Sequence, residues 1–282
     1  MRRSRSRSGN RSGRSRASVG LLFLPVTCLL LAIPLVMGGS AAAAPILWVS
    51  DFAGRLGTVD ATTGAVTVIG TMGTVMTDIA FDTNQDLYGV SGNLLHSIDP
   101  TTAVSTVIGS LGTSVSSLTF SPSGVLYGAQ GALFSIDKNT GAATSIGSGG
   151  FPYSSSGDLA FVGGNLFLSS AASPGDNLVQ LDTNSGVGTL IGAIGFSVVY
   201  GLATDNNSDL YGVAGTTVLS IDPLTGASSV NVDYAGQGLG SAFGSAFITE
   251  APEPGTATLL GIGLVGLAGR RRQKFGRRRT LV

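Results

Sequence analysis

Short apolar runs alternate with turn residues between Pro45 and Glu250, and the alternation repeats about every 40 residues. No part of this segment keeps an apolar period of 3.6 residues, so the pattern predicts strands and not helices. One marker of the repeat is a leucine followed by an aromatic residue. Its five copies are Leu47-Trp48, Leu87-Tyr88, Leu126-Tyr127, Leu166-Phe167 and Leu210-Tyr211.

Three further markers divide each repeat into four short apolar runs separated by Gly, Asp, Asn, Ser and Pro, which are turn residues. An aliphatic-Asp pair occurs at Val59-Asp60, Ile98-Asp99, Ile136-Asp137, Leu181-Asp182 and Ile221-Asp222. An Ile-Gly pair occurs at Ile69-Gly70, Ile108-Gly109, Ile146-Gly147 and Ile191-Gly192. A fourth marker occurs at Ile79-Ala80-Phe81, Leu118-Thr119-Phe120, Leu159-Ala160-Phe161, Leu202-Ala203-Thr204 and, as we expect, Ser241-Ala242-Phe243.

Four strands in about 40 residues are typical of a β-propeller blade. The first repeat lacks the strand that precedes the Leu-aromatic marker, and the segment ends with a spare strand, 238–247. Pairing this last strand with the first blade would close the ring and remove its free edges. We therefore predict an all-β domain, 45–250, with five four-stranded blades; an open β-solenoid or a sandwich is the alternative. The pattern resembles quinoprotein-like and YncE-like propellers of exported bacterial proteins.

The C-terminal segment 251–282 combines three features of a processing signal. Pro252, Glu253 and Pro254 predict an exposed, non-helical strip, because proline donates no backbone hydrogen bond. The apolar run 256–268 would form a helix of about 20 Å, shorter than the bilayer core of about 30 Å. A basic cluster follows, beginning with Arg270, Arg271 and Arg272. An ordinary single-span tail anchor is the alternative interpretation.

This tail resembles the PEP-CTERM sorting signal of bacterial exported proteins. The resemblance implies that the apolar helix transiently anchors the chain in the inner membrane. It also implies that exosortase, a membrane cysteine protease, removes the tail, and that the product reaches the cell surface or the extracellular matrix.

The N-terminal segment 1–44 has the layout of a signal peptide, with seven arginines before residue 17 and then an apolar run, 19–37, predicted to be helical. Small residues end the segment, so we expect cleavage by signal peptidase. A retained N-terminal anchor is the alternative.

Removing both ends changes the charge of the chain. The formal net charge is zero, but the segment 45–250 has two basic residues, Arg55 and Lys138, against fourteen Asp and one Glu, so its net charge is −13 (2 minus 15). Such a domain repels nucleic acid and anionic lipid. The single cysteine, Cys28, lies in the N-terminal segment, so the domain forms no disulfide and is not a thiol enzyme.

Two turns have the pattern D-x-N-x-D, which places oxygen ligands where a calcium loop uses them. They comprise Asp82, Asn84 and Asp86, and Asp205, Asn207 and Asp209. Both lack the glycine at position 6 and the glutamate at position 12 of a calcium loop. We therefore expect hairpin turns in which Asp and Asn cap the backbone, with weak calcium binding as the alternative and no other cofactor.

Positions where one repeat departs from the others are better candidates for function. Asp78 and Asp158 begin strands where the other copies have Ser117, Gly201 and, as we align them, Gly240, so both could face a central channel. Tyr200 and Tyr234 could add aromatic surface for a sugar. By contrast, the Asp of the aliphatic-Asp marker recurs in every repeat, which indicates a turn-forming role.

Three classes of function remain open at this level: a module that binds glycan or a surface protein, a scaffold of the exopolysaccharide or biofilm matrix, and a propeller glycosidase or lyase. An enzyme of the last class would need a pair of carboxyl groups, and Asp78 and Asp158 form the candidate pair. The domain has one histidine, one arginine and one lysine, which leaves little material for a histidine-metal site or a catalytic triad. We therefore expect a non-catalytic structural or binding role.

Overall fold

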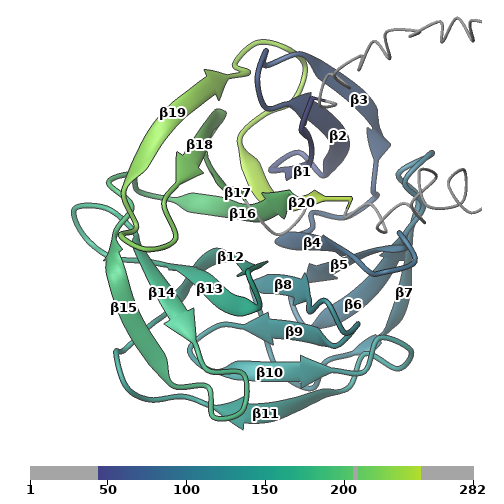
Figure 1. Cartoon of the computed structure of the whole chain (residues 1–282). Coiled ribbons are helices and arrows are strands. Elements are labelled where there is room, and N and C mark those ends of the chain that lie inside the picture. The colour runs from purple at the N-terminus through teal and green to yellow at the C-terminus, as the bar shows by residue number, and fades with distance from the viewer. Residues whose placement is uncertain (1–43, 206–208, 249–282) are drawn as a thin grey trace, which may run out of the picture. The chain divides into compact units, whose positions relative to one another are not determined.

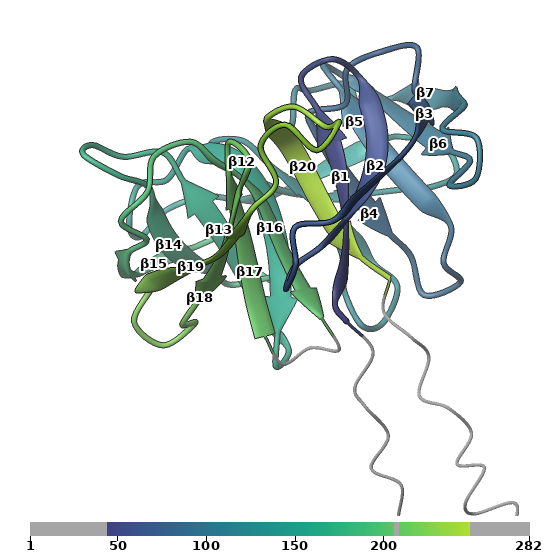
Figure 2. The same ribbon diagram turned by 90° about the horizontal axis from the view of Figure 1, so that it is seen from above.

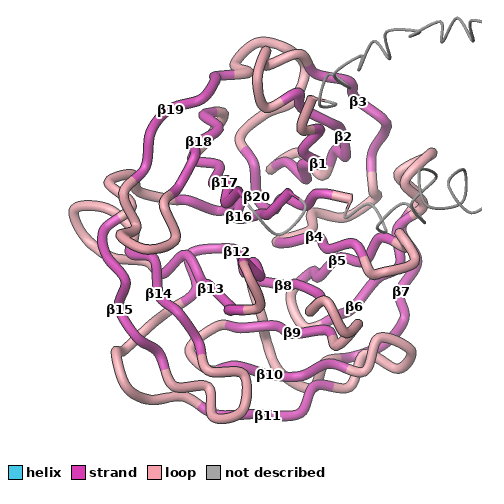
Figure 3. The backbone as a smooth tube through the Cα atoms, viewed as in Figure 1, coloured by secondary structure: helices cyan, strands magenta, loops and turns pink. Residues whose placement is uncertain are grey.

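The computed structural model describes residues 44–205 and 209–248, which form twenty strands in five antiparallel sheets (Figure 1). No helix is present in this described part (Figure 3). Blade 1 contains β20 (Ala242–Phe247), β1 (Ile46–Asp51), β2 (Arg55–Asp60) and β3 (Val66–Thr71). Blade 2 contains β4 (Asp78–Phe81), β5 (Leu87–Ser91), β6 (Leu94–Ile98) and β7 (Ser105–Ser110).

The other three blades have the same order of strands from the centre outward. Blade 3 contains β8 (Ser117–Phe120), β9 (Leu126–Ala129), β10 (Leu133–Ile136) and β11 (Ala143–Gly147). Blade 4 contains β12 (Ser155–Val162), β13 (Asn165–Ser170), β14 (Asn177–Leu181) and β15 (Gly188–Ala193). Blade 5 contains β16 (Val199–Asp205), β17 (Asp209–Ala214), β18 (Thr217–Ile221) and β19 (Ser228–Asp233).

The blades form a ring with one strand of each at the centre. The inner strands β4, β8, β12, β16 and β20 surround the axis, and β3, β7, β11, β15 and β19 run around the perimeter (Figure 1). This arrangement confirms the predicted all-β, five-bladed propeller. The predicted apolar helices 19–37 and 256–268 lie outside the described residues.

The last strand closes the ring, as predicted, because β20 pairs with β1 in blade 1. The register corrects one detail. Leu47 pairs with Phe247 just as Leu87 pairs with Phe81, so the fourth marker of the last repeat is 245–247 and not 241–243. Both triplets read Ser-Ala-Phe, and only the strand pairing distinguishes them.

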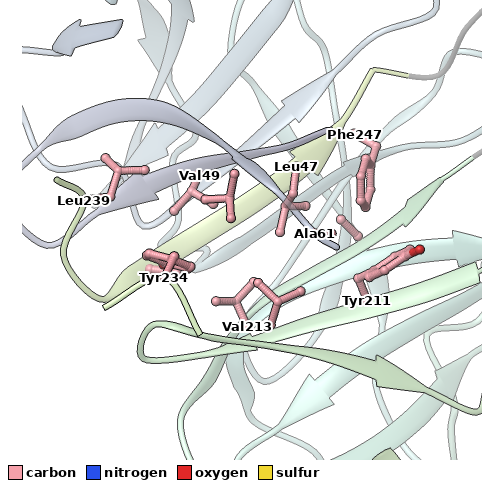
Figure 4. Packing of buried hydrophobic residues seen from close by; sticks show 12 residues of the cluster. Leu47, Val49, Ala61, Tyr211, Val213, Tyr234, Leu239 and Phe247 are labelled. Atoms are coloured by element: carbon pink, nitrogen blue, oxygen red, sulfur yellow. The ribbon is translucent and has the colours of Figure 1, made fainter. Parts of the chain in front are cut away.

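The core consists of five apolar clusters, each composed largely of side chains from two neighbouring blades. Figure 4 shows the cluster between blades 5 and 1, where Leu47 and Val49 of β1 lie against Val213 of β17. Tyr234 is completely buried in this cluster, so it stabilises the closure of the ring and offers no surface to a sugar. Continuous apolar contact between blades therefore replaces a single central core.

The Asp of each aliphatic-Asp marker shapes a turn, as predicted. The Asp60 carboxylate accepts the backbone N–H of Thr62 at 2.8 Å, and the Asp60 carbonyl accepts the N–H of Gly64 at 2.8 Å. Gly64 has φ of +74°, a conformation that favours glycine. The other four blades repeat the side-chain contact at Asp99, Asp137, Asp182 and Asp222.

The inner strands all run from one face of the ring to the other, which defines two faces. Because Leu47 pairs with Phe247, the start of β1 and the end of β20 lie side by side (Figure 2). We call this side the tail face; it also holds the turns that follow β4 and β16, where both D-x-N-x-D sequences lie. The opposite side, where the inner strands begin and the loop 51–55 connects β1 to β2, is the mouth face.

Candidate functional site

Two aspartates meet at the centre of the ring. Asp78 opens β4 in blade 2 and Asp158 lies in β12 of blade 4, and neither has any exposed surface. Both reach the same part of β20, because Oδ1 of Asp78 lies against Gly244 and Asp158 accepts the N–H of the next residue, Ser245. Their carboxyl groups therefore lie close enough at the axis to interact with each other. The structure thus brings together the two residues that sequence reasoning chose as departures from the repeat. We call them the axial pair.

The axial pair accepts hydrogen bonds from all five inner strands. Asp78 accepts the N–H groups of Ile79 in β4, at 2.7 Å, and of Leu118 in β8, at 2.5 Å. Asp158 accepts the N–H groups of Leu159 in β12 and Leu202 in β16, both at 2.6 Å. Ser245 of β20 donates to the Asp158 carboxylate through its N–H at 3.2 Å and its hydroxyl at 3.4 Å.

Burial raises the pKa of both carboxyl groups well above the ordinary range, and the charge of Asp158 raises the pKa of Asp78 further. No cation compensates them, because the two basic side chains of 44–248 are engaged elsewhere. Arg55 pairs with Asp51 at 2.7 Å and Lys138 pairs with Asp82 at 2.6 Å. Asp158 accepts more hydrogen bonds than Asp78, so a negative charge is more stable on Asp158 and a proton is more stable on Asp78.

Small residues at the equivalent positions of the other blades leave room for the pair. The strand registers align Asp78 and Asp158 with Ser117, Gly201 and Gly244. In blade 1 the equivalent residue is therefore Gly244 and not Gly240, because β20 pairs with β1 through Phe247 opposite Leu47. A Cβ atom on Gly244 would lie 2.4 Å from Oδ1 of Asp78.

The enclosure of the axial pair keeps a substrate away from its carboxyl groups. Both residues lie at the centre of the ring, as expected of channel residues, but their oxygens are enclosed by inner-strand backbone and have no exposed surface. A glycosidase needs its two carboxyl groups on either side of a bound glycosidic bond. In this conformation a sugar does not reach Asp78 or Asp158.

The first D-x-N-x-D turn already has a positive charge beside it. Oδ1 of Asp82 accepts the N–H groups of Asn84, at 2.8 Å, and Asp86, at 3.0 Å, while Oδ2 binds the Lys138 ammonium. Burial alone would raise the pKa of Asp82, but the hydrogen bonds from Lys138 and the backbone lower it. Lys138 belongs to the β10–β11 turn, so the ion pair links blades 2 and 3.

The second turn is described only in part, because Asn207 lies outside the described residues. Asp205 accepts the N–H of Asp209 at 3.2 Å, and burial, together with the charge of Asp209, raises the pKa of Asp205. Within 44–205 and 209–248, no three His, Cys, Asp or Glu residues are grouped as metal ligands. The hairpin-turn role stays the prediction for both sequences, with weak calcium binding as its alternative.

Three aromatic rings gather on the mouth face, beside the end of the axis. Phe52, from the β1–β2 loop, stacks on Phe243 with ring centroids 3.8 Å apart, and Tyr200 of β16 lies 5.6 Å from Phe243 and 5.8 Å from Phe52. Phe52 is 47% exposed, whereas Tyr200 and Phe243 are half-buried. Phe243 directly precedes Gly244, the residue of β20 that lies against Asp78. We call the three rings the mouth platform.

Backbone contacts hold the mouth platform in place. The N–H of Phe52 donates to the carbonyl of Ser241 at 3.1 Å, and the buried Asp51 accepts the N–H of Gly240 at 2.9 Å. Arg55 completes this loop by pairing with Asp51. Sequence reasoning selected Tyr200 but missed the two phenylalanines, because their approach depends on the pairing of β20 with β1.

Comparisons with known proteins identify the sorting signal and the fold. Residues 250–272 match the PEP-CTERM protein-sorting motif, which confirms the resemblance drawn from the tail. No curated protein sequence is similar to this chain. The described part of the structure does not include the predicted processing motif or the basic cluster, which comprise Pro252, Glu253, Pro254, Arg270, Arg271 and Arg272. No helix within the described part is long and apolar enough to cross a membrane.

Several solved structures are similar to this chain at low sequence identity. A chain of the nidogen/laminin complex has a TM-score of 0.51 and 12% identity, covering 72% of this chain and 82% of that one. A gluconolactonase from Xanthomonas campestris has a TM-score of 0.46 and 14% identity, covering 71% and 79%. A PQQ-bound aldose sugar dehydrogenase from Streptomyces coelicolor has a TM-score of 0.38 and 16% identity, covering 51% and 58%.

These likenesses define a class of fold and no activity. The chain is a five-bladed β-propeller, and the likeness to the chain of the nidogen/laminin complex agrees with this fold. It carries a PEP-CTERM motif, which indicates an exported protein that crosses the membrane and is sorted to the cell surface by exosortase-type machinery.

Proposed function

We propose that this exported protein is a non-catalytic propeller that binds an uncharged glycan of the exopolysaccharide or biofilm layer through the mouth platform. Signal peptidase and exosortase would process its two ends, and the apolar tail would anchor it in the inner membrane before cleavage. The observation that carries the proposal is the mouth platform, in which the exposed Phe52 packs with the half-buried Tyr200 and Phe243 on the mouth face.

The position of the platform suits a protein held by its C-terminus. The described chain ends beside the start of β1 on the tail face, and the platform lies where the inner strands begin. A protein attached or anchored through its tail would therefore direct the platform outward. Aromatic rings present a large, rigid and apolar surface, and Tyr200 adds a hydroxyl at its rim.

The negative charge of the propeller domain limits which glycans it can bind. The segment 45–250 has a net charge of −13, and both of its basic side chains are engaged with aspartates. Such a surface repels polysaccharides rich in uronic acid or sulfate. An uncharged sugar, or one with amino groups, fits this surface better.

The enclosure of the axial pair supports a non-catalytic role. A propeller glycosidase or lyase that uses Asp78 and Asp158 is the alternative, and it requires a conformation in which the inner strands separate. Turnover of a glycan that is lost in Asp78→Asn and Asp158→Asn, but kept in Phe52→Ala, would favour this alternative over the proposal.

The test is a binding titration of the full-length protein, in nonionic detergent, with exopolysaccharide purified from the host. We expect saturable binding that weakens at least about tenfold in Phe52→Ala and Tyr200→Ala, the loss typical of a central aromatic contact. Leu224→Ala is the matched control, since Leu224 is 84% exposed in the turn between β18 and β19.

Other outcomes would identify the other classes of function. Saturable binding that Phe52→Ala does not weaken would refute the mouth platform as the site. No saturable binding to the polymer would refute the glycan proposal, and a matrix scaffold or a protein-binding module would then replace it.

A further inference from the structure

We propose that the axial pair of Asp78 and Asp158 shares one proton, that this proton holds the centre of the ring closed, and that its loss loosens the propeller under alkaline conditions. The proposal is independent of the glycan function. It rests on the position of two uncompensated carboxyl groups where five blades meet.

The first step is that the two carboxyl groups cannot both be charged without a large cost. They are fully buried, they contact each other, and neither contacts a basic side chain among the described residues. Two adjacent negative charges that are shielded from bulk solvent repel each other strongly. One proton converts the repulsion into a charge-assisted hydrogen bond from Asp78 to Asp158.

The second step is that the hydrogen-bond pattern favours a single negative charge. Five backbone N–H groups and the Ser245 hydroxyl point at the pair, so one carboxylate is well stabilised. A doubly protonated pair would leave these donors with weaker acceptors. The pair therefore holds one proton over a broad range of pH.

The third step links this proton to ring closure. Asp78 ties β4 to β8, and Asp158 ties β12 to β16 and, through Ser245, to β20. The bond between the two carboxyl groups joins these two sets of strands. Repulsion after the loss of the proton would thus push apart elements from all five blades at once.

No other ionisable side chain of the inner or neighbouring strands shares the role that we propose for the axial pair. The five inner strands and the strand next to each contain further titratable residues, but none of those hydrogen-bonds to the pair in the described part. They are Asp51, Tyr88, Tyr127, Tyr200, Asp205, Asp209 and Tyr211. Asp51 is paired with Arg55, and Asp205 and Asp209 lie at the opposite end of blade 5.

The sign of the pH dependence follows from linkage. The folded protein keeps a proton that the unfolded carboxyl releases above about pH 4, so the contribution to stability is full below that pH. It is lost as pH rises toward the folded pKa of the pair. In this window the unfolding constant rises about tenfold for each pH unit.

The test is urea unfolding of the full-length protein in nonionic detergent, followed by the fluorescence of Trp48, the one tryptophan, between about pH 5 and pH 9. We expect the ratio of the wild-type to the Asp78→Asn unfolding constant to increase with pH by up to tenfold per unit. Asp51→Asn is the matched control. Its carboxyl titrates below this range in both states, so it should leave the slope unchanged.

A second measurement does not require the variant to fold. Infrared spectroscopy of wild-type protein with ¹³C-labelled aspartate should show one protonated carboxylic acid near neutral pH, whose band disappears as pH rises together with the loss of stability. Equal slopes for wild type and Asp78→Asn, or no protonated carboxyl near neutral pH, would overturn the proposal.

Discussion

Replacing Gly244 by alanine tests how closely the blades approach at the axis. The added Cβ would lie 2.4 Å from Oδ1 of Asp78, 2.5 Å from its Cα atom and 3.0 Å from the backbone N of Ile79. Two of these three contacts are with backbone atoms, which cannot rotate away. The φ angle of Gly244 lies outside the left-handed region, so the cost comes from contact and not from backbone conformation.

The cost follows from overpacking in a tightly packed interior, which is typically about 1–3 kcal/mol. We expect about 3 kcal/mol for Gly244→Ala, because β4 or β20 must shift and the hydrogen bonds of the axial pair shift with it. For a domain of this size, each kcal/mol lowers Tm by about 2–4 °C, so the loss is about 6–12 °C. The assay is urea and thermal unfolding followed by Trp48 fluorescence.

Gly131→Ala is the matched control for this prediction. Gly131 lies in the turn between β9 and β10, and a Cβ atom there would meet nothing within 4 Å. Alanine should be neutral or stabilise the protein by up to about 1 kcal/mol, through the lower entropy of the unfolded chain. Equal stability of the two variants would refute the close approach of β20 and β4 at Asp78.

Two further predictions concern single side chains. His96 is buried, and neither ring nitrogen has a hydrogen-bond partner among the described residues. Burial lowers the pKa of His96 in the folded protein. As pH falls below about 6.5, the unfolded chain should therefore bind a proton at His96 before the folded protein does. Stability should then fall by up to about 1.4 kcal/mol per pH unit, and His96→Leu should abolish this acid slope in urea unfolding; an unchanged slope would contradict the buried, unpaired ring. Lys138→Met should lower the free energy of unfolding by at most about 1 kcal/mol, because the Lys138 side chain is partly exposed. Because Asp82 is already paired with Lys138, millimolar calcium should not raise the Tm of the wild-type protein through Asp82. A calcium-dependent rise that Asp82→Asn removes would establish a metal site at this turn.

The repeat pattern predicted the number of blades and the closing strand because each marker reports a local property. A leucine-aromatic pair on one strand and Asp at a turn depend on neighbours a few residues away. The alignment of the last repeat failed because Ser-Ala-Phe occurs twice in seven residues. Choosing between the copies required the pairing of Leu47 with Phe247, a contact that spans almost the whole domain.

The candidate site was predictable only in part, for a related reason. Asp78 and Asp158 stood out because they interrupt a repeat, and pseudo-symmetry places such residues at the same level of the ring. Their mutual contact and their enclosure depend on the width of the axis, which no local pattern encodes. Tyr234 was a candidate for aromatic surface that could bind a sugar, but it fills the space between blades 5 and 1.

The pairing of β20 with β1 also sets the order of events during export. The two strands are joined through a loop of about 200 residues (247 minus 47), so the ring cannot close until β20 has crossed the membrane. The sorting motif begins only three residues after β20. Closure of the ring and arrival of the sorting motif at its processing machinery would therefore be nearly simultaneous, and before that point the strands that have crossed could form only an open arc of blades.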